Sequence, residues 1–281
     1  IQRIRLSVLN RKLMSSFCNR SAEFFKIYSK FKSYNIYIII YSFFMDSKFQ
    51  KNFCLRHKDA SIDIIVKKNK LSRNYKFTFD KKNLRGLVSI PKYVSFGEGL
   101  AFAKENADWI HKQVSSFSPL IFIENNTNII FEGRAKKIIF EDNVTTDVSI
   151  EKKNIIIKAK VGKHKIILRD WMKKRTLSIL ENVIESYSKT LQVHVKKIRL
   201  SNSYNYWGYC NTAGVISINW RLIFAPLEVM RYIVAHELSH LIEFNHSDKF
   251  WHQVESLCPD YKKQIKWLKK NDNYLYRVRF D

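Results

Sequence analysis

One short stretch of the sequence combines histidines and a glutamate inside a segment that has the hydrophobic pattern of a core helix. His236 and His240 are four residues apart, and Glu237 follows the first histidine directly. Residues four apart share one face of an α-helix, so these two imidazoles can bind one metal ion. Glu237 then lies beside the open coordination position, where a general base is needed. The pattern predicts a zinc site of the catalytic type.

A zinc ion in a catalytic site takes three protein ligands and leaves the fourth position to water, so a third ligand is required. His246, six residues after His240, is the nearest candidate. Its side chain reaches the metal only if the helix ends between Glu243 and His246. Asn245 suits that position, because asparagine tolerates the left-handed conformation that ends many helices. We therefore predict that His246 is the third ligand.

Two residues of the following segment are alternatives for the third ligand. Glu255 can supply a carboxylate and His252 an imidazole, and zinc accepts both kinds of donor. His246 is favoured over them because it is nearer to the motif. Between these positions, Ser247 or Asp248 is expected to cap the next helix.

The residues before the motif predict a helix with one buried side. Pro226 suits the first turn of such a helix. Apolar residues then recur as a broad stripe, at Val229, Tyr232, Ile233, Val234, Leu238, Leu241 and Ile242. Phe250 and Trp251, further along the chain, are expected to pack behind the metal site. The histidines are therefore expected on a helix that the protein core covers.

Further motifs surround the histidines. They are Tyr206-Trp207-Gly208-Tyr209-Cys210, Ile218-Asn219-Trp220-Arg221-Leu222, Ala225-Pro226, Asn245-His246-Ser247-Asp248-Lys249-Phe250-Trp251, Pro259-Asp260-Tyr261 and Trp267-Leu268. This combination resembles the YgjP-like metal-dependent hydrolases, which are relatives of the SprT-like and WLM zinc proteases. The resemblance covers roughly residues 60 to 271 and is strongest beyond residue 200. It implies a zinc peptidase in which His246 is the third ligand.

The sequence departs from that family at one motif. Where the family usually has Arg-Trp-Gly-Ser-Cys, this chain has Tyr206 and Tyr209 on either side of Trp207-Gly208. Any role of the family's arginine or serine in substrate binding is therefore not carried over to this chain.

These residues predict a zinc-dependent metallohydrolase, and a peptidase in particular. Zinc polarises a carbonyl group and a water molecule, and Glu237 takes the proton of that water and passes it to the leaving amine. The oxyanion that develops needs a further hydrogen-bond donor. Tyr206, Tyr209 and Arg221 are candidates because they lie near the motif in the sequence.

The formal charge of +25, from 50 basic and 25 acidic residues, suits binding to nucleic acid or another anionic partner. The basic residues form no single stripe in the sequence, however, and an abundance of lysine raises the charge without a binding site. A protein or peptide substrate is the expected partner, and nucleic acid is a further one. The alternative function is a basic nucleic-acid- or protein-binding module that keeps a zincin fold without peptidase activity.

The cysteines and the apolar segments bear on the compartment of the protein. Cys18, Cys54, Cys210 and Cys258 form no Cys-x-x-Cys pair, so neither a disulfide framework nor a cysteine zinc site is expected. The apolar run at 36–44 is shorter than the roughly 20 residues of a membrane-spanning helix. We therefore predict a cytoplasmic protein without a transmembrane span.

The hydrophobic periodicity changes twice along the chain. Residues 1–44 are expected to be a leader outside the native fold, with the native chain starting at Met45. Residues 45–165 have short strand-like runs at 62–66, 75–79, 87–90, 120–123, 129–131, 137–140 and 155–161, and one helix at 98–115. Residues 166–281 predict a zincin-like metallopeptidase domain.

Within that second region, a long helix is expected to about residue 191, followed by strands near 195–200 and 214–219 and a hairpin turn at 211–214. The long helix, the small sheet and the helix with the histidines form the core of such a domain. The predicted fold class is therefore α+β, a zincin-like catalytic domain preceded by a β-rich N-terminal part.

Overall fold

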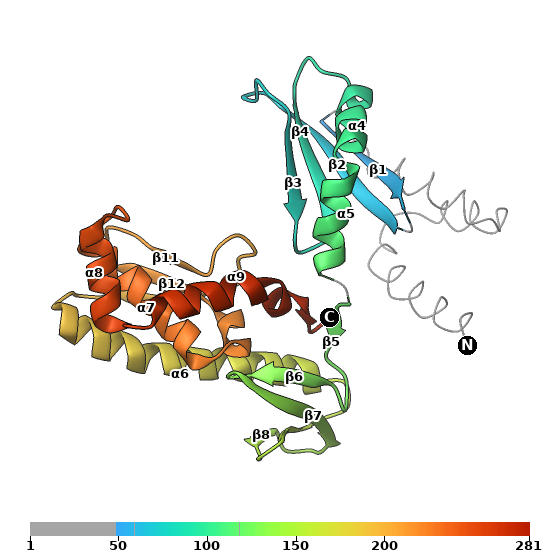
Figure 1. The fold of residues 1–281 in the computed structure, drawn as a ribbon. Helices are drawn as coiled ribbons and strands as arrows, with labels where there is room; N and C mark the ends of the chain where they lie inside the picture. Colours follow the sequence, from blue (N-terminus) through green and yellow to red (C-terminus); the bar gives the residue numbers. More distant parts are fainter. Residues whose placement is uncertain (1–48, 59, 118) are drawn as a thin grey trace. The chain divides into compact units, whose positions relative to one another are not determined.

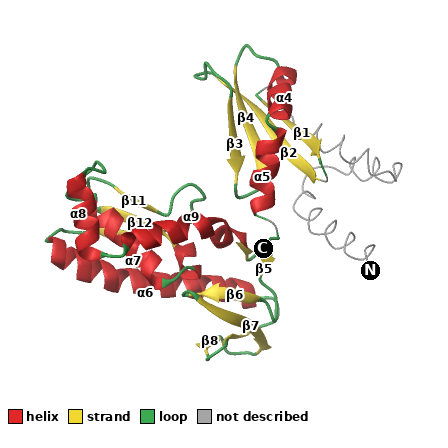
Figure 2. Cartoon of the chain, viewed as in Figure 1, coloured by secondary structure: helices red, strands yellow, loops and turns green. Residues whose placement is uncertain are grey.

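The computed structural model describes residues 49–58, 60–117 and 119–281, which form parts of two compact units. Unit 1 extends to Thr78 and includes Gly86–Glu105, whereas unit 2 comprises Phe79–Arg85 and Asn106–Asp281. The predicted leader, residues 1–44, and the predicted start at Met45 lie outside the described residues. Both units contain helices and strands (Figures 1 and 2), so the fold is a mixture of α and β structure.

Unit 1 is built on a four-stranded sheet with the order β1-β2-β4-β3. The strands are β1 (Gln50–His57), β2 (Ala60–Asn69), β3 (Lys76–Asp80) and β4 (Arg85–Pro91). β1 and β2 are antiparallel, and β2 and β4 are parallel. Helix α4 (Phe96–Glu105) packs on β2. Three of these strands were predicted from their apolar runs, and β1 was not.

The single helix predicted over 98–115 is two helices, α4 and α5 (Ala107–Ser116). The backbone of Asn106 leaves the helical region there, with φ −102° and ψ 22°. Asparagine favours such breaks because its side chain competes for backbone hydrogen bonds. At the other end of α4, Ser95 and Glu98 each accept a hydrogen bond from the other's backbone N–H, a capping box that fixes the start of the helix.

Unit 2 contains two larger sheets. The first has the order β6-β7-β9-β8 and consists of β6 (Asn128–Phe131), β7 (Arg134–Asp142), β8 (Asp147–Ile150) and β9 (Asn154–Ala159). The second has the order β10-β12-β11, from β10 (Lys197–Ser201), β11 (Gly208–Cys210) and β12 (Val215–Asn219). β10 is parallel to β12 and β11 is antiparallel to it. Two short strands, β5 (Ile121–Phe122) and β13 (Val278–Arg279), pair in parallel.

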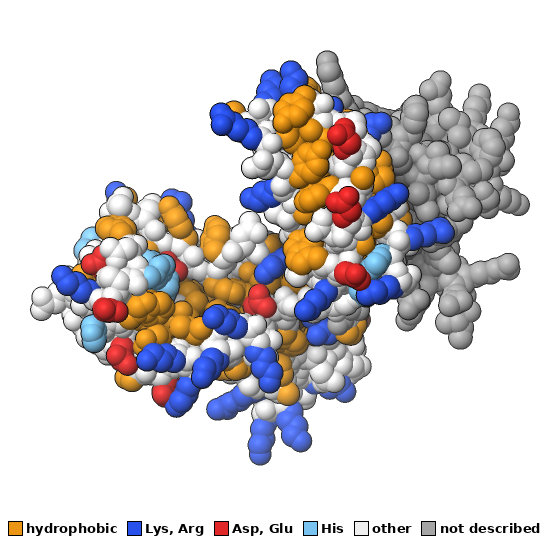
Figure 3. Space-filling model, turned by 45° about the horizontal axis from the view of Figure 1, so that its top comes forward, with side chains coloured by type: hydrophobic (Ala, Val, Ile, Leu, Met, Phe, Trp, Pro, Cys, Tyr) orange, Lys and Arg blue, Asp and Glu red, His pale blue; other side chains and the backbone are white. Residues whose placement is uncertain are grey.

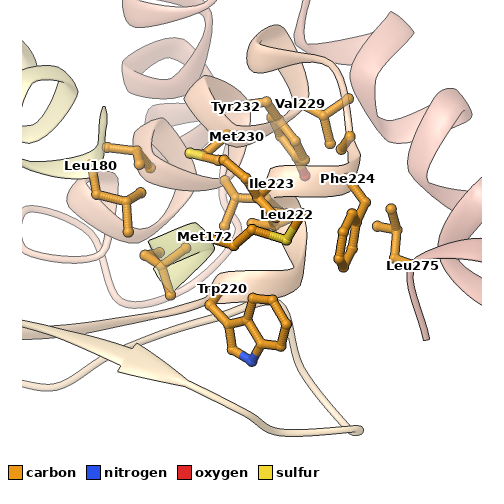
Figure 4. Close-up of a cluster of buried hydrophobic side chains, with 14 of the residues drawn as sticks. Met172, Leu180, Trp220, Leu222, Ile223, Phe224, Val229, Met230, Tyr232 and Leu275 are labelled. Carbon is orange, nitrogen blue, oxygen red and sulfur yellow. The ribbon is translucent and has the colours of Figure 1, made fainter. Parts of the chain in front are cut away.

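Five of the described helices of unit 2 contribute side chains to its core. They are α6 (His164–Leu191), the 3₁₀ helix η1 (Trp220–Phe224), α7 (Leu227–Ser239), α8 (Asp248–Leu257) and α9 (Tyr261–Arg277). Side chains from α6, η1, α7 and α9 meet in the apolar cluster shown in Figure 4. Met172, Leu222 and Met230 have no exposed surface there. The core therefore surrounds α7, which is buried along most of its length.

The sequence predicted much of this part of the fold. The long helix appears as α6, the two later strands as β10 and β12, and the hairpin turn as the link from Asn211 to Gly214, where Gly214 N–H donates to Asn211 O at 3.0 Å. β8, β11 and β13 were not predicted. The predicted division after residue 165 lies inside unit 2 and stays a prediction.

No helix among the described residues combines the length and the apolar character that crossing a membrane requires. The cytoplasmic location stays a prediction.

A tight turn joins β6 to β7 and supports the start of α7. Phe131 and Arg134 pair across the hairpin, and the two residues between them have positive φ, 47° for Glu132 and 75° for Gly133. This is the conformation of a two-residue turn that matches the twist of a hairpin. Glu132 N–H donates to Ile223 O at 2.8 Å, and Gly133 lies against Pro226, the N-cap of α7.

We predict that Gly133→Ala destabilises the protein more than Gly162→Ala. Both glycines have positive φ, 75° and 78°, so both substitutions carry a backbone cost of roughly 1–2 kcal/mol. A methyl group on Gly133 would also lie 2.9 Å from Pro226 Cα, whereas one on Gly162 meets no atom within 4 Å. The overlap should add about 1–3 kcal/mol. Chemical denaturation of the two variants measures the difference, and equal losses would contradict it.

Candidate active site

Helix α7 carries His236 and Glu237 and ends at Ser239, so the prediction that it continues to between residues 243 and 246 was wrong. His240 is the C-cap residue and keeps helical dihedral angles, φ −66° and ψ −16°. The last turn tightens, since Ile242 N–H donates to Ser239 O. Ser239 Oγ–H also donates to Ala235 O at 2.8 Å. His240 therefore stays on the face of His236 although the regular helix has ended.

Asn245 does not return the chain in the left-handed conformation that the sequence suggested. Asn245 is not one of the described residues whose φ is positive. Its side-chain Oδ1 instead accepts a hydrogen bond from Ser247 N–H at 3.0 Å, which forms a local turn. Ser247 Oγ then accepts from Phe250 N–H and caps α8, as predicted. His246 is held between these two turns.

The structure brings His236, His240 and His246 together. One ligand atom from each lies within 4.8 Å of the others, and His236 Nε2 is 3.3 Å from His246 Nε2. The ring of Phe250, which has no exposed surface, lies 4.6–4.9 Å from all three imidazole rings. Trp251 stacks on His246 at 5.9 Å. The predicted packing of both aromatic residues behind the histidines is confirmed.

Within this donor set, one pair of nitrogens has the spacing of two ligands on a zinc ion. Two nitrogens bound at about 2.0–2.1 Å in a tetrahedral site are about 3.3–3.4 Å apart, which matches the pair of His236 and His246. The Nδ1 atom of His240 lies 3.2 Å from Glu243 O. When Nδ1–H donates a hydrogen bond to that carbonyl, the lone pair of Nε2 is available to a metal. Burial lowers the pKa of His236 to about 4, with His240 and His246 as lesser causes. A neutral imidazole offers the lone pair that a metal needs.

The alternative donors do not join this group. Glu255 and His252 are exposed on α8. Among the described residues, the three histidines are the one group of three or more His, Cys, Asp or Glu side chains close enough to hold a metal. Cys210 is half-buried, and burial raises the pKa of its thiol to about 11, so it stays protonated at neutral pH.

Glu237 is buried beneath β11. Its exposed fraction is 6%, and burial raises the pKa of its carboxyl group to about 8. The backbone of Gly208 lies directly on it, because a methyl group at that position would be 2.6 Å from Glu237 Cδ. Sequence reasoning missed this contact, and its one signal was the glycine between Trp207 and Tyr209. Only glycine leaves room for the carboxylate at this point of the strand.

The three candidate donors for an oxyanion differ in their surroundings. Arg221 is 6% exposed, and its guanidinium group donates to Asn202 Oδ1 and to Tyr204 Oη. It is therefore a structural residue and no longer a candidate. Tyr206 and Tyr209 are exposed, on either side of the Trp207-Gly208 pair, with ring centroids 6.3 Å apart. They remain candidates.

We predict that Glu237→Gln stabilises the metal-free protein at high pH only. The pKa of this group is about 8 in the folded chain and 4.5 without burial. As pH rises between these values, the unfolded chain releases the proton and the folded chain keeps it, so the stability of the wild type falls. The variant lacks this titration and should gain about 2–4 kcal/mol at high pH and nothing at low pH.

Denaturation curves in the presence of a chelator, at pH 4.5 and pH 8, test this difference. Glu255→Gln, on the exposed face of α8, is the matched control and should gain nothing at either pH. The same gain at both pH values would contradict the assignment of the effect to the carboxyl group of Glu237.

Comparisons with known proteins show what the chain is similar to. The chain is similar to the crystal structure of the metallopeptidase zymogen abylysin from Pyrococcus abyssi, with 24% identity and a TM-score of 0.30, over 32% of this chain and 93% of that one. No curated protein matches it. The family model of the YgjP-like metallopeptidase domain matches residues 73–271, which include all three histidines and Glu237. This chain belongs to the YgjP-like metallopeptidase family.

Proposed function

We propose that this chain is a zinc-dependent peptidase with a zincin-like catalytic centre. His236, His240 and His246 would hold the metal, and Glu237 would act as general base. The observation that carries the proposal is the convergence of three imidazoles next to α7, the helix that also carries the buried carboxylate of Glu237. Family membership supports a metal-dependent reaction on a protein or peptide.

The chemistry divides between the metal and the protein. When bound, Zn²⁺ supplies Lewis acidity toward a water molecule and the carbonyl group to be cleaved. Glu237 accepts the proton of that water and later donates it to the leaving amine. In the metal-free chain, burial favours the protonated carboxyl group, and a neighbouring cation favours the ionised form that a base requires. The cation and the burial of Glu237 thus act on its pKa in opposite directions.

The rim of the site supplies groups for the substrate. Tyr206 and Tyr209 present exposed side chains on either side of the backbone that covers Glu237. A phenol group can donate a hydrogen bond to the oxygen that becomes negative during peptide cleavage. We assign the contact with the substrate carbonyl to one of these two tyrosines, because both are exposed next to the backbone that covers Glu237.

The alternative is a binding protein that keeps the fold and uses zinc structurally or not at all. A structural zinc site has four protein ligands and needs no base. The three histidines with an adjoining buried carboxylate favour the catalytic arrangement instead.

We predict that His246→Ala loses the zinc that the wild type retains on purification, and that Glu237→Gln keeps it. Glu237→Gln should lower kcat on a denatured protein substrate by about 10²–10⁴-fold, because it removes the proton transfer. Metal analysis by mass spectrometry and a peptidase assay on the same preparations measure both effects. Glu255→Ala is the control and should change neither. Zinc kept in His246→Ala would move the third ligand elsewhere, and zinc without any turnover in the wild type would favour the binding protein.

We also predict that Gly208→Ala lowers kcat and leaves zinc content unchanged. Its methyl group would force Glu237 away from its position, because the three atoms nearest to that methyl group all belong to the Glu237 side chain. A loss of about 10²-fold follows for a displaced catalytic group. Gly97→Ala is the matched control, because a methyl group there meets only Ser95 Oγ at 3.8 Å. Full activity in Gly208→Ala would show that the carboxylate tolerates the shift.

A further inference from the structure

Helix α9 (Tyr261–Arg277) has a cationic face and an apolar face. The apolar face packs into the core with Tyr261, Leu275 and Tyr276, which are all buried. The cationic side chains fall within an arc of about 120° on the opposite side, at 100° per residue. They are Lys262, Lys263, Lys266, Lys269, Lys270 and Arg277. The stripe is about 22 Å long, from 1.5 Å of rise per residue.

Little negative charge compensates this stripe. Lys263 pairs with Asp260 at 2.8 Å, an exposed contact at one end of the helix. Lys266, Lys269 and Lys270 are exposed and form no ion pair with a carboxylate in the described part of the chain. Asp272, the acidic residue within α9, pairs with Lys81 instead. The centre of the face therefore keeps three unpaired positive charges.

A pocket of about 410 Å³ opens beside these lysines. Trp267 and Tyr274, at the edge of the cationic arc, line it together with Phe224, and Lys270 and Arg277 supply its positive charges. Its volume lies within the roughly 300–1,000 Å³ of small-molecule sites. Aromatic surface and cations thus meet in one pocket at the side of the lysine stripe.

We propose that this face of α9 binds single-stranded nucleic acid. Phosphates would lie along the lysines, and a base would enter the pocket and stack on its aromatic lining, which is how sequence-tolerant single-strand binding works. Lys and Arg side chains also gather beside an apolar area on the face of the molecule in Figure 3. The proposal does not rest on the peptidase activity, because neither the histidines nor Glu237 take part.

Two other anionic partners fit this face less well. A duplex keeps the faces of its bases stacked inside, so the aromatic pocket would find no base to bind. A helix that lies on a lipid surface inserts exposed apolar side chains, and none of the exposed large hydrophobic residues of the described chain is on α9. Unpaired bases are the partner that uses both the lysines and the pocket.

The test is the affinity of the full chain for a fluorescent oligothymidylate, by polarisation at several salt concentrations. The variant Lys266→Gln/Lys269→Gln/Lys270→Gln should bind at least tenfold more weakly and lower the slope of log K against log salt by about 2. The matched control is Lys152→Gln/Lys153→Gln/Lys160→Gln, three exposed lysines that flank β9, which removes the same charge and should keep the affinity within about twofold.

A second variant separates stacking from charge. Trp267→Leu should weaken binding of the oligothymidylate about fivefold or more and leave the weaker binding of a duplex unchanged. An equal loss of affinity in the two triple-lysine variants would overturn the proposal, since net charge alone would then explain the binding. Absence of binding by the wild type, equal affinity for the duplex, or binding only to vesicles of anionic lipid would also overturn it.

Discussion

The burial of α7 is the constraint on which the candidate metal site depends. Apolar residues from Val229 to Leu238 are buried, and α6, α8, α9, η1, β11 and β12 all contact the helix. A helix packed on so many sides cannot rotate, because a shift of one residue turns each side chain by about 100° and would carry apolar groups out of the core. The spacing of His236, Glu237 and His240 in the sequence is thereby converted into fixed positions around one point.

The same burial raises the free energy of the polar groups that it holds in place. His236 Nδ1 is buried without a hydrogen-bond partner, and Glu237 lies under β11 with its pKa raised. Buried polar groups without partners cost free energy, so apolar packing elsewhere in the core has to offset them. Natural proteins accept such local conflicts at functional sites. The conflict in this chain is located at the residues proposed to hold zinc and to move a proton.

The strand that covers Glu237 is supported from a distant part of the chain. The hydroxyl group of Tyr204, in the segment before β11, accepts hydrogen bonds from Arg221 and from Arg279 near the C-terminus. Its ring stacks on Tyr276 of α9 with centroids 5.0 Å apart. Helix α9 therefore packs against the segment before β11 with one face and presents lysines on the other. Gly208 can lie on the carboxylate because its neighbours in the chain are held in this way.

The sequence by itself determined the chemistry of the site and the longest elements. The four-residue spacing of His236 and His240 and the hydrophobic period of α6 are local patterns. In a helix, the spacing of residues in the sequence directly sets which side chains share a face. The end of α7 at Ser239, the burial of Arg221 and the contact of Gly208 with Glu237 depend on residues far apart in the chain. So does the pocket beside α9, because it needs Phe224 of η1. Tertiary packing alone decided these features, because the hydrophobic periodicity of one segment does not specify which distant backbone will pack against its side chains.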